Sequence, residues 1–117
     1  MEGPKDWKLY EEKVAKALTR KGFKVLVRNY RGRFGEIDLL AEKGNKLLVV
    51  EVKGGKRAEF LLQRVDCRKV KRMLLTLQEW LGENPSYESF EIFFVAALVG
   101  PDGLAFVPFS PDDCVEP

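Results

Sequence analysis

The sequence contains no histidine, and this absence removes several kinds of catalytic site. It excludes Ser-His-Asp and Cys-His catalysis, zinc bound by imidazole, and nucleases that use histidine as a general base. The phosphate-binding loops G-x-x-x-x-G-K-[ST] and G-x-G-x-x-G, which mark nucleotide hydrolases and dinucleotide-binding domains, are also missing. Any chemistry must therefore come from carboxylates, lysines and a metal that they hold.

Cysteine and long apolar runs are scarce. Cys67 and Cys114 are the only two cysteines, too few and too far apart for a disulfide scaffold or a zinc cluster, so we expect two reduced thiols. No apolar run approaches the roughly 20 residues that span a bilayer, and the charged N-terminal stretch lacks a signal-peptide core. These features predict a cytoplasmic protein that makes no use of a membrane.

Basic residues are missing from the last part of the chain. Residues 1–72 contain all 20 lysines and arginines with 10 of the 18 acids, a net charge of +10, whereas residues 73–117 contain 8 acids and no base. Such segregation favours a polyanionic partner, such as nucleic acid. The alternative is that the acidic part balances the basic part within the molecule.

The pattern of apolar residues predicts one α/β domain over residues 1–117, with its core at about 8–109. We expect a helix from about Tyr10 that stops at Gly22, and a second helix from an N-cap at Asp66 to about Leu81, with Gly82 as its stop. Predicted strands cover residues 23–30, 36–41, 46–53, 90–99 and 104–109, and Pro108 places the last of them at a sheet edge. The order α-β-β-β-α-β-β predicts a central mixed sheet flanked by helices.

The two strands at 36–41 and 46–53 contain ionisable residues among isoleucine, leucine and valine. If the two-residue turn Gly44–Asn45 joins them, position i pairs with position 89 minus i, and Asp38 stands opposite Glu51. Two directly opposed carboxylates on a half-apolar sheet repel each other, and a divalent cation such as Mg²⁺ or Mn²⁺ would neutralise them. Lys53 shares the face of Glu51. This set suits metal-assisted hydrolysis of a phosphodiester.

A purely structural interpretation of the same residues also exists. Glu36 could pair with Lys53, and Asp38 with Arg33, in an ion-pair network on a solvated face. From spacing alone the two interpretations are about equally good.

Together the two strands resemble the D…(D/E)-x-K core of the restriction-endonuclease-like superfamily, and more narrowly the bacterial YraN-like family. The matching residues occur in the family's order over about residues 10–95. They are Glu11, Gly22 and Phe23; Asn29, Tyr30 and Arg31; Gly35, Glu36, Ile37 and Asp38; Val50, Glu51, Val52 and Lys53; and Val65 and Lys69. The resemblance implies a restriction-endonuclease-like core and endonuclease-like chemistry.

The resemblance also implies roles for particular residues. Asp38 and Glu51 would be metal ligands, the Val52 carbonyl a further ligand, and Lys53 the catalytic lysine. Glu11 would be the acid that the first helix brings toward the metal. Helical spacing places Glu11 on the apolar side of that helix, although it could equally be an ordinary first-turn acid stabilised by the helix dipole.

The chain departs from the family after the catalytic lysine, where a small hydroxyl residue and an arginine are usual. Here Gly54 and Gly55 precede Lys56 and Arg57, so that the arginine is displaced. We expect the basic residues near the hairpin to contact phosphates: Arg28, Arg31, Arg33, Lys56, Arg57, Arg64, Arg68 and Lys69.

Three functions remain open from the sequence. The first is a Mg²⁺- or Mn²⁺-dependent nuclease acting on branched or structured DNA, of which a Holliday-junction resolvase, and with it a homodimer, is a sharper form. The second is a nucleic-acid-binding module of the same fold that has lost turnover. The third is a protein-interaction domain whose acidic part docks a basic partner.

Overall fold

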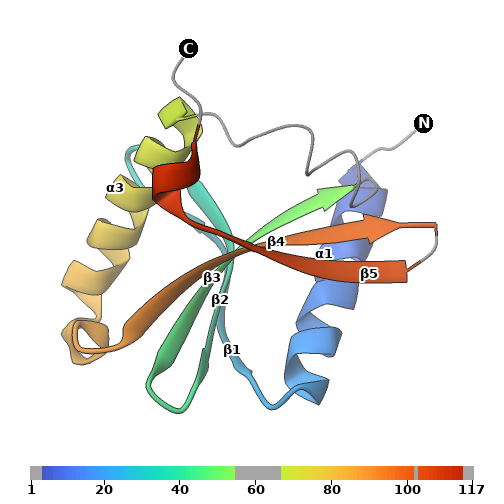
Figure 1. The fold of residues 1–117 in the computed structure, drawn as a ribbon, viewed down its shortest axis with the longest axis horizontal. Helices are drawn as coiled ribbons and strands as arrows, with labels where there is room; N and C mark the ends of the chain where they lie inside the picture. The colour runs from blue at the N-terminus through green and yellow to red at the C-terminus, as the bar shows by residue number, and fades with distance from the viewer. Residues whose placement is uncertain (1–3, 55–66, 102, 115–117) are drawn as a thin grey trace.

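A five-stranded mixed sheet forms the centre of the molecule, with the strand order β1-β2-β3-β4-β5 (Figure 1). The computed structural model describes residues 4–54, 67–101 and 103–114, with side chains from residue 7 onward. The strands are β1 (Lys24–Arg31), β2 (Glu36–Lys43), β3 (Lys46–Gly54), β4 (Glu91–Gly100) and β5 (Gly103–Phe109). β3 and β4 are parallel, and the other neighbouring strands are antiparallel. The mixed sheet and the order of elements are confirmed.

The hairpin β2–β3 has the register that its two-residue turn predicts. Leu39 lies opposite Val50, and Lys43 opposite Lys46, so each pair of positions sums to the predicted 89. The turn is possible because Gly44 adopts a φ of 63°, a left-handed conformation that costs glycine little. Since side chains alternate along a strand, this register decides which residues share a face of the sheet.

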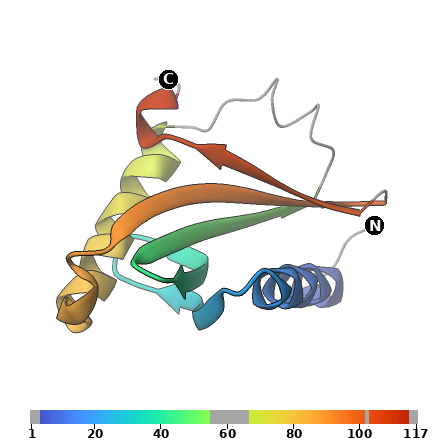
Figure 2. The ribbon, with the colours of Figure 1, turned by 60° about the horizontal axis from the view of Figure 1, so that its bottom comes forward.

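Two helices cover opposite faces of the sheet (Figure 2). Helix α1 (Pro4–Arg20) buries Val14 and Leu18 against one set of strand side chains, whereas α3 (Cys67–Glu83) buries Met73 and Leu77 against the other. The parallel pairing of β3 with β4 requires such a crossover, and α3 lies within it. Within the described ranges, no helix combines the length and the apolar character that crossing a membrane requires.

Helix α1 begins at Pro4, six residues before the predicted start at Tyr10. Proline is well suited to the first turn of a helix, where its missing N–H is not needed. The predicted stop is confirmed, because Gly22 has a φ of 93° and the N–H of Phe23 donates to the Leu18 carbonyl at 3.0 Å. The earlier start matters because it adds a turn and a half of helix beside the sheet.

Helix α3 runs to Glu83, past the predicted stop at Gly82, and a 3₁₀ helix η1 (Pro85–Tyr87) follows. Gly82 is helical here, and the chain leaves the helix only as it reaches Pro85. The predicted N-cap, Asp66, lies outside the described residues. Strand β5 is an edge strand, as Pro108 predicted.

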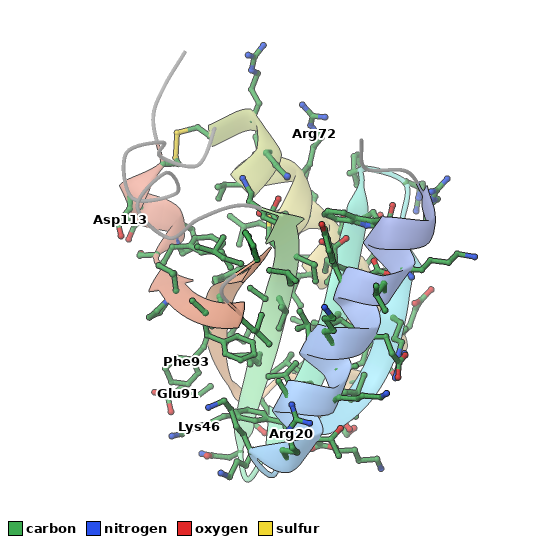
Figure 3. The ribbon with its side chains drawn as sticks, turned by 90° about the vertical axis from the view of Figure 1, so that its right-hand side faces the viewer. Arg20, Lys46, Arg72, Glu91, Phe93 and Asp113 are labelled. Carbon is green, nitrogen blue, oxygen red and sulfur yellow. A yellow bond between two sulfur atoms is a disulfide. The ribbon has the colours of Figure 1, made fainter. Side chains whose placement is uncertain are left out.

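The prediction of two reduced thiols is wrong, because Cys67 and Cys114 form a disulfide. The 3₁₀ helix η2 (Pro111–Asp113) follows β5 and brings Cys114 to the first residue of α3, with a Cα–Cα distance of 4.9 Å (Figure 3). The two residues are 47 positions apart, and only the return of β5 across the sheet brings them together. Sequence separation alone could not reveal this proximity.

Candidate active site

Asp38 and Glu51 lie where the β2–β3 hairpin stops pairing through its backbone. The last paired residues are Leu39 and Val50, one position before the two acids. There the backbone N–H of Val52 donates to Oδ2 of Asp38 at 2.8 Å, so the carboxylate replaces a main-chain acceptor. Both acids line one cavity of about 330 Å³. The predicted convergence of Asp38 and Glu51 is therefore present in the structure.

The environment of Asp38 disfavours its charged form. Burial raises the pKa of Asp38 to about 6, against the Val52 hydrogen bond, which lowers it. The negative charges of Glu51, Glu11 and Glu36 add to the rise. The neighbouring carboxylates thus repel one another electrostatically. A bound cation would reduce this repulsion and favour the charged form of Asp38.

Glu51 is the most deeply placed acid of the hairpin, with 5% of its surface exposed. Its Oε1 contacts the ammonium group of Lys69, which reaches across from α3 and is itself half exposed. Among the described residues, neither carboxylate oxygen of Glu51 accepts a hydrogen bond of normal geometry. One lysine therefore offsets the charge of Glu51 at Oε1, while Oε2, which accepts no hydrogen bond from the described residues, remains available to a ligand.

Glu11 approaches the same acids from α1. It is 5% exposed, and its Oε1 accepts a hydrogen bond from the Asn29 amide at 3.1 Å. Asn29 adopts a φ of 54°, a left-handed conformation uncommon outside glycine. Glu12 instead points outward and pairs with Arg28 at 2.6 Å, which lowers the pKa of Glu12. Glu11 therefore lies on the buried side of α1, as predicted. The role of Glu11 in a site remains a prediction.

Four segments of the molecule line the cavity. They are residues 35–38, residues 50–53 at the end of β3, Trp7 of α1, and three residues of α3. Its lining residues are Trp7, Gly35, Glu36, Ile37, Asp38, Val50, Glu51, Val52, Lys53, Lys69, Arg72 and Met73. Figure 3 shows Arg72 projecting from α3 at the end of the molecule opposite Arg20 and Lys46. Carboxylates, cations and an aromatic ring thus meet in one cavity.

A single hard divalent cation fits the donors at this place. Among the described residues, no three aspartate, glutamate, cysteine or histidine side chains form a ready metal centre. Mg²⁺, however, commonly binds through one or two carboxylates and keeps several of its waters. Asp38 and Glu51 would supply the carboxylates, Glu51 has unused lone pairs, and the cavity leaves room for water. Val52, whose carbonyl is the third predicted ligand, lines the same cavity.

The basic residues predicted to contact phosphates have different surroundings. Arg28 pairs with Glu12, Arg31 with Glu36 at 3.4 Å, and Arg33 with Glu79 at 4.0 Å. Lys69 lies in the cavity, and Arg68 is exposed beside it on α3. Lys56, Arg57 and Arg64 lie outside the described residues. Contact of any of these residues with nucleic acid remains a prediction.

These ion pairs also bear on the structural interpretation of the hairpin. Arg33 does not neutralise Asp38, because its guanidinium lies beside Glu79, and its backbone N–H donates to Glu79 Oε1 at 2.8 Å. Glu36 is paired with Arg31 on the neighbouring strand. Arg33 therefore does not lower the pKa of Asp38, which stays raised.

Two cavity residues, Trp7 and Arg72, were not among the predicted site residues. Trp7 precedes the predicted helix start at Tyr10, so its place on α1 was not foreseen. A signal was available, since Trp7, Glu11, Val14 and Leu18 have the 4-3-4 spacing of one helix face. For Arg72, the signal is its position one turn after Lys69 on the same helix.

Comparison with known proteins identifies the family. The model of the uncharacterised protein family UPF0102 matches residues 10–97. A UPF0102 protein of Thermotoga petrophila is 38% identical over 99 residues, which cover 85% of this chain and 90% of the relative. A UPF0102 protein of Pseudothermotoga lettingae is 40% identical over 88 residues, covering 74% and 82% of the two chains. A third, from Tropheryma whipplei, is 33% identical over 102 residues, covering 86% and 82%. The chain therefore belongs to the UPF0102 family, which is the YraN-like family that its motifs resemble.

Proposed function

We propose that this protein is a divalent-metal-dependent nuclease that hydrolyses phosphodiester bonds in branched or otherwise structured DNA. The observation that carries the proposal is the convergence of Asp38, Glu51 and Lys53 on one cavity. Asp38 and Glu51 would hold Mg²⁺ or Mn²⁺, with the Val52 carbonyl as a further ligand. When bound, the cation supplies Lewis-acid activation of the phosphate and lowers the pKa of a bound water.

The chain's own residues perform the remaining tasks. The Lys53 ammonium orients the attacking water or neutralises the charge that develops on the phosphate. The Val52 N–H fixes the orientation of the Asp38 carboxylate through its 2.8 Å hydrogen bond. Glu11, held by Asn29, adds negative charge on the α1 side and so favours a cation near Asp38. Arg72, which lines the cavity, binds a neighbouring phosphate.

The test is cleavage of branched, flapped and linear DNA in Mn²⁺, in Mg²⁺ and in EDTA. We expect cleavage only with a divalent cation, and a loss of at least about a hundredfold in Asp38→Ala and in Glu51→Gln. Glu91→Gln is the matched control, because Glu91 is exposed at the far end of the molecule from Arg72 (Figure 3). Failure of the wild type to cut any substrate, or full activity of Asp38→Ala, would overturn the proposal.

One observation favours a second function, a nucleic-acid-binding module without turnover. The Lys69 ammonium already provides a positive charge at Glu51, as a metal would. In that case DNA binding would persist in EDTA and in Glu51→Gln, and would weaken steeply with salt. The cleavage assay separates the two functions. The nuclease forms product as the wild type and not as Glu51→Gln, whereas the binding module forms no product in either case.

A further inference from the structure

We propose that Trp7 is a stacking platform for an unpaired base beside the scissile phosphate, so that the site accepts single-stranded or flapped DNA. The proposal rests on the proposed function and narrows its substrate to strands with exposed bases. It begins from the contrast between the two tryptophans. Trp80 is 6% exposed in the core, whereas Trp7 is 37% exposed on α1 and lines the cavity of Asp38 and Glu51.

The Trp7 ring is held in place while part of it remains exposed. Tyr10, one turn later on α1, contacts it in a T-shaped arrangement with ring centroids 6.3 Å apart. Tyr10 in turn packs against the core cluster that contains Val14 and Leu18. An indole anchored from one side, and still more than one-third exposed, can accept a flat ligand at small entropic cost.

The charged residues that line the cavity indicate which other chemical groups the ligand has. Lys53, Lys69 and Arg72 supply positive charge, and the two acids can hold a cation. A ligand that meets all of these groups has a planar ring and a phosphate within one unit, as a nucleotide does. A cavity of about 330 Å³ lies near the lower end of small-ligand pockets, which suits one nucleotide.

Stacking on Trp7 discriminates between single strands and continuous duplex. In a duplex, both faces of an internal base are covered by its neighbours, and exposing one costs the unstacking of a base pair. An unpaired base avoids this cost and gains the base–aromatic contact. A single strand, a flap or a frayed end is therefore the favoured ligand.

The experiment measures tryptophan fluorescence and affinity with a short oligothymidylate and with a blunt duplex of the same length, in Ca²⁺ and in EDTA. Because Trp80 is buried, quenching reports on Trp7. We expect the single strand to quench and the duplex not to. We also expect about a tenfold loss of single-strand affinity in Trp7→Leu and near wild-type affinity in Trp7→Phe, which keeps an aromatic face.

Leu9→Ala is the control, because Leu9 is a 51% exposed apolar residue on the same helix that does not line the cavity. Unchanged single-strand affinity in Trp7→Leu, equal quenching by both ligands, or no binding of either would overturn the inference. The readout does not require turnover. Quenching without cleavage would reject the nuclease alone, and metal-dependent cleavage with no effect of Trp7→Leu would reject the stacking platform alone.

Discussion

At the scale of the residue, three carboxylates lie near one another, and each is held by a named partner. Asp38 accepts from the Val52 N–H, Glu51 contacts the Lys69 ammonium, and Glu11 accepts from Asn29. Burying charge is costly unless each group is paired. Asn29 adds backbone strain beside Glu11, since its φ is 54°. Strain and like charges gathered near one cavity are typical of functional sites, where they are offset by stability elsewhere.

The raised pKa of Asp38 predicts a dependence of stability on pH. The folded chain releases this proton near pH 6, whereas the unfolded chain releases it near the ordinary value of 3.8. The folded state therefore binds more protons between these values, and its free energy of unfolding falls as pH rises through them, by at most about 3 kcal/mol. Urea unfolding in EDTA, compared with Asp38→Asn at each pH, isolates this contribution. A difference between the two proteins that does not change with pH would contradict the assignment.

Lys69→Met should separate the effects of charge and metal at Glu51. In EDTA we expect a loss of roughly 2 kcal/mol, because a buried carboxylate is left without its counter-ion. Saturating Mn²⁺ should raise the thermal midpoint of the variant more than that of the wild type, since no ammonium has to be displaced. Lys71→Met is the matched control, two residues away and exposed on the same helix. Equal Mn²⁺-induced shifts in all three proteins would argue against a cation at Glu51.

At the scale of the element, the site is assembled from a hairpin and two helices that approach from opposite faces of the sheet. The hairpin was predictable, because strand alternation and a two-residue turn are local properties that fix the register. Helical spacing places Trp7 on the face of Glu11 and Arg72 one turn after Lys69, but it does not show how α1 and α3 pack at the end of β3, so both contributions were missed. The disulfide was missed for the same reason, since tertiary structure alone brings Cys114 to α3.

The ends of the two helices predict opposite effects of the same substitution. Gly22→Ala should destabilise the fold by about 1 kcal/mol, because Gly22, two residues past the end of α1, has a φ of 93°, and an added Cβ would lie 3.2 Å from Lys43 Cε. Gly82→Ala should stabilise it by about 0.5 to 1 kcal/mol, because Gly82 is helical and an added Cβ meets no atom within 4 Å. Urea unfolding of both variants checks the two signs, and destabilisation by Gly82→Ala would show that this end of α3 is misassigned.

At the scale of the whole molecule, an ion pair joins the basic part of the chain (residues 1–72) to the acidic part (residues 73–117), and so does a disulfide. Arg33, from the basic part, pairs with Glu79 of the acidic part, so some of the segregated charge is balanced internally. Exposed pairs of this kind contribute little, and phosphates can replace the carboxylates at small cost. The Cys67–Cys114 disulfide fastens the end of the described chain to the start of α3, the helix that supplies Lys69 and Arg72 to the cavity.

Reduction of this disulfide should lower stability. A bridge between residues 47 positions apart restricts the unfolded chain by about 4 kcal/mol in the loop-entropy model. We therefore expect the thermal midpoint of the wild type to fall in dithiothreitol to near that of Cys114→Ser, which should itself be insensitive to the reductant. Thiol titration confirms the state of the bridge. An oxidised wild type no more stable than Cys114→Ser would contradict this account.

The central claim, that Asp38 and Glu51 hold one divalent cation between them, is tested most directly by calorimetric titration of Mn²⁺ into the metal-free chain at pH 7.5. We predict one Mn²⁺ per chain for the wild type and for Glu91→Gln, and loss of that binding in Asp38→Asn and in Glu51→Gln. Absence of binding by the wild type, or undiminished binding in either site variant, would contradict the claim.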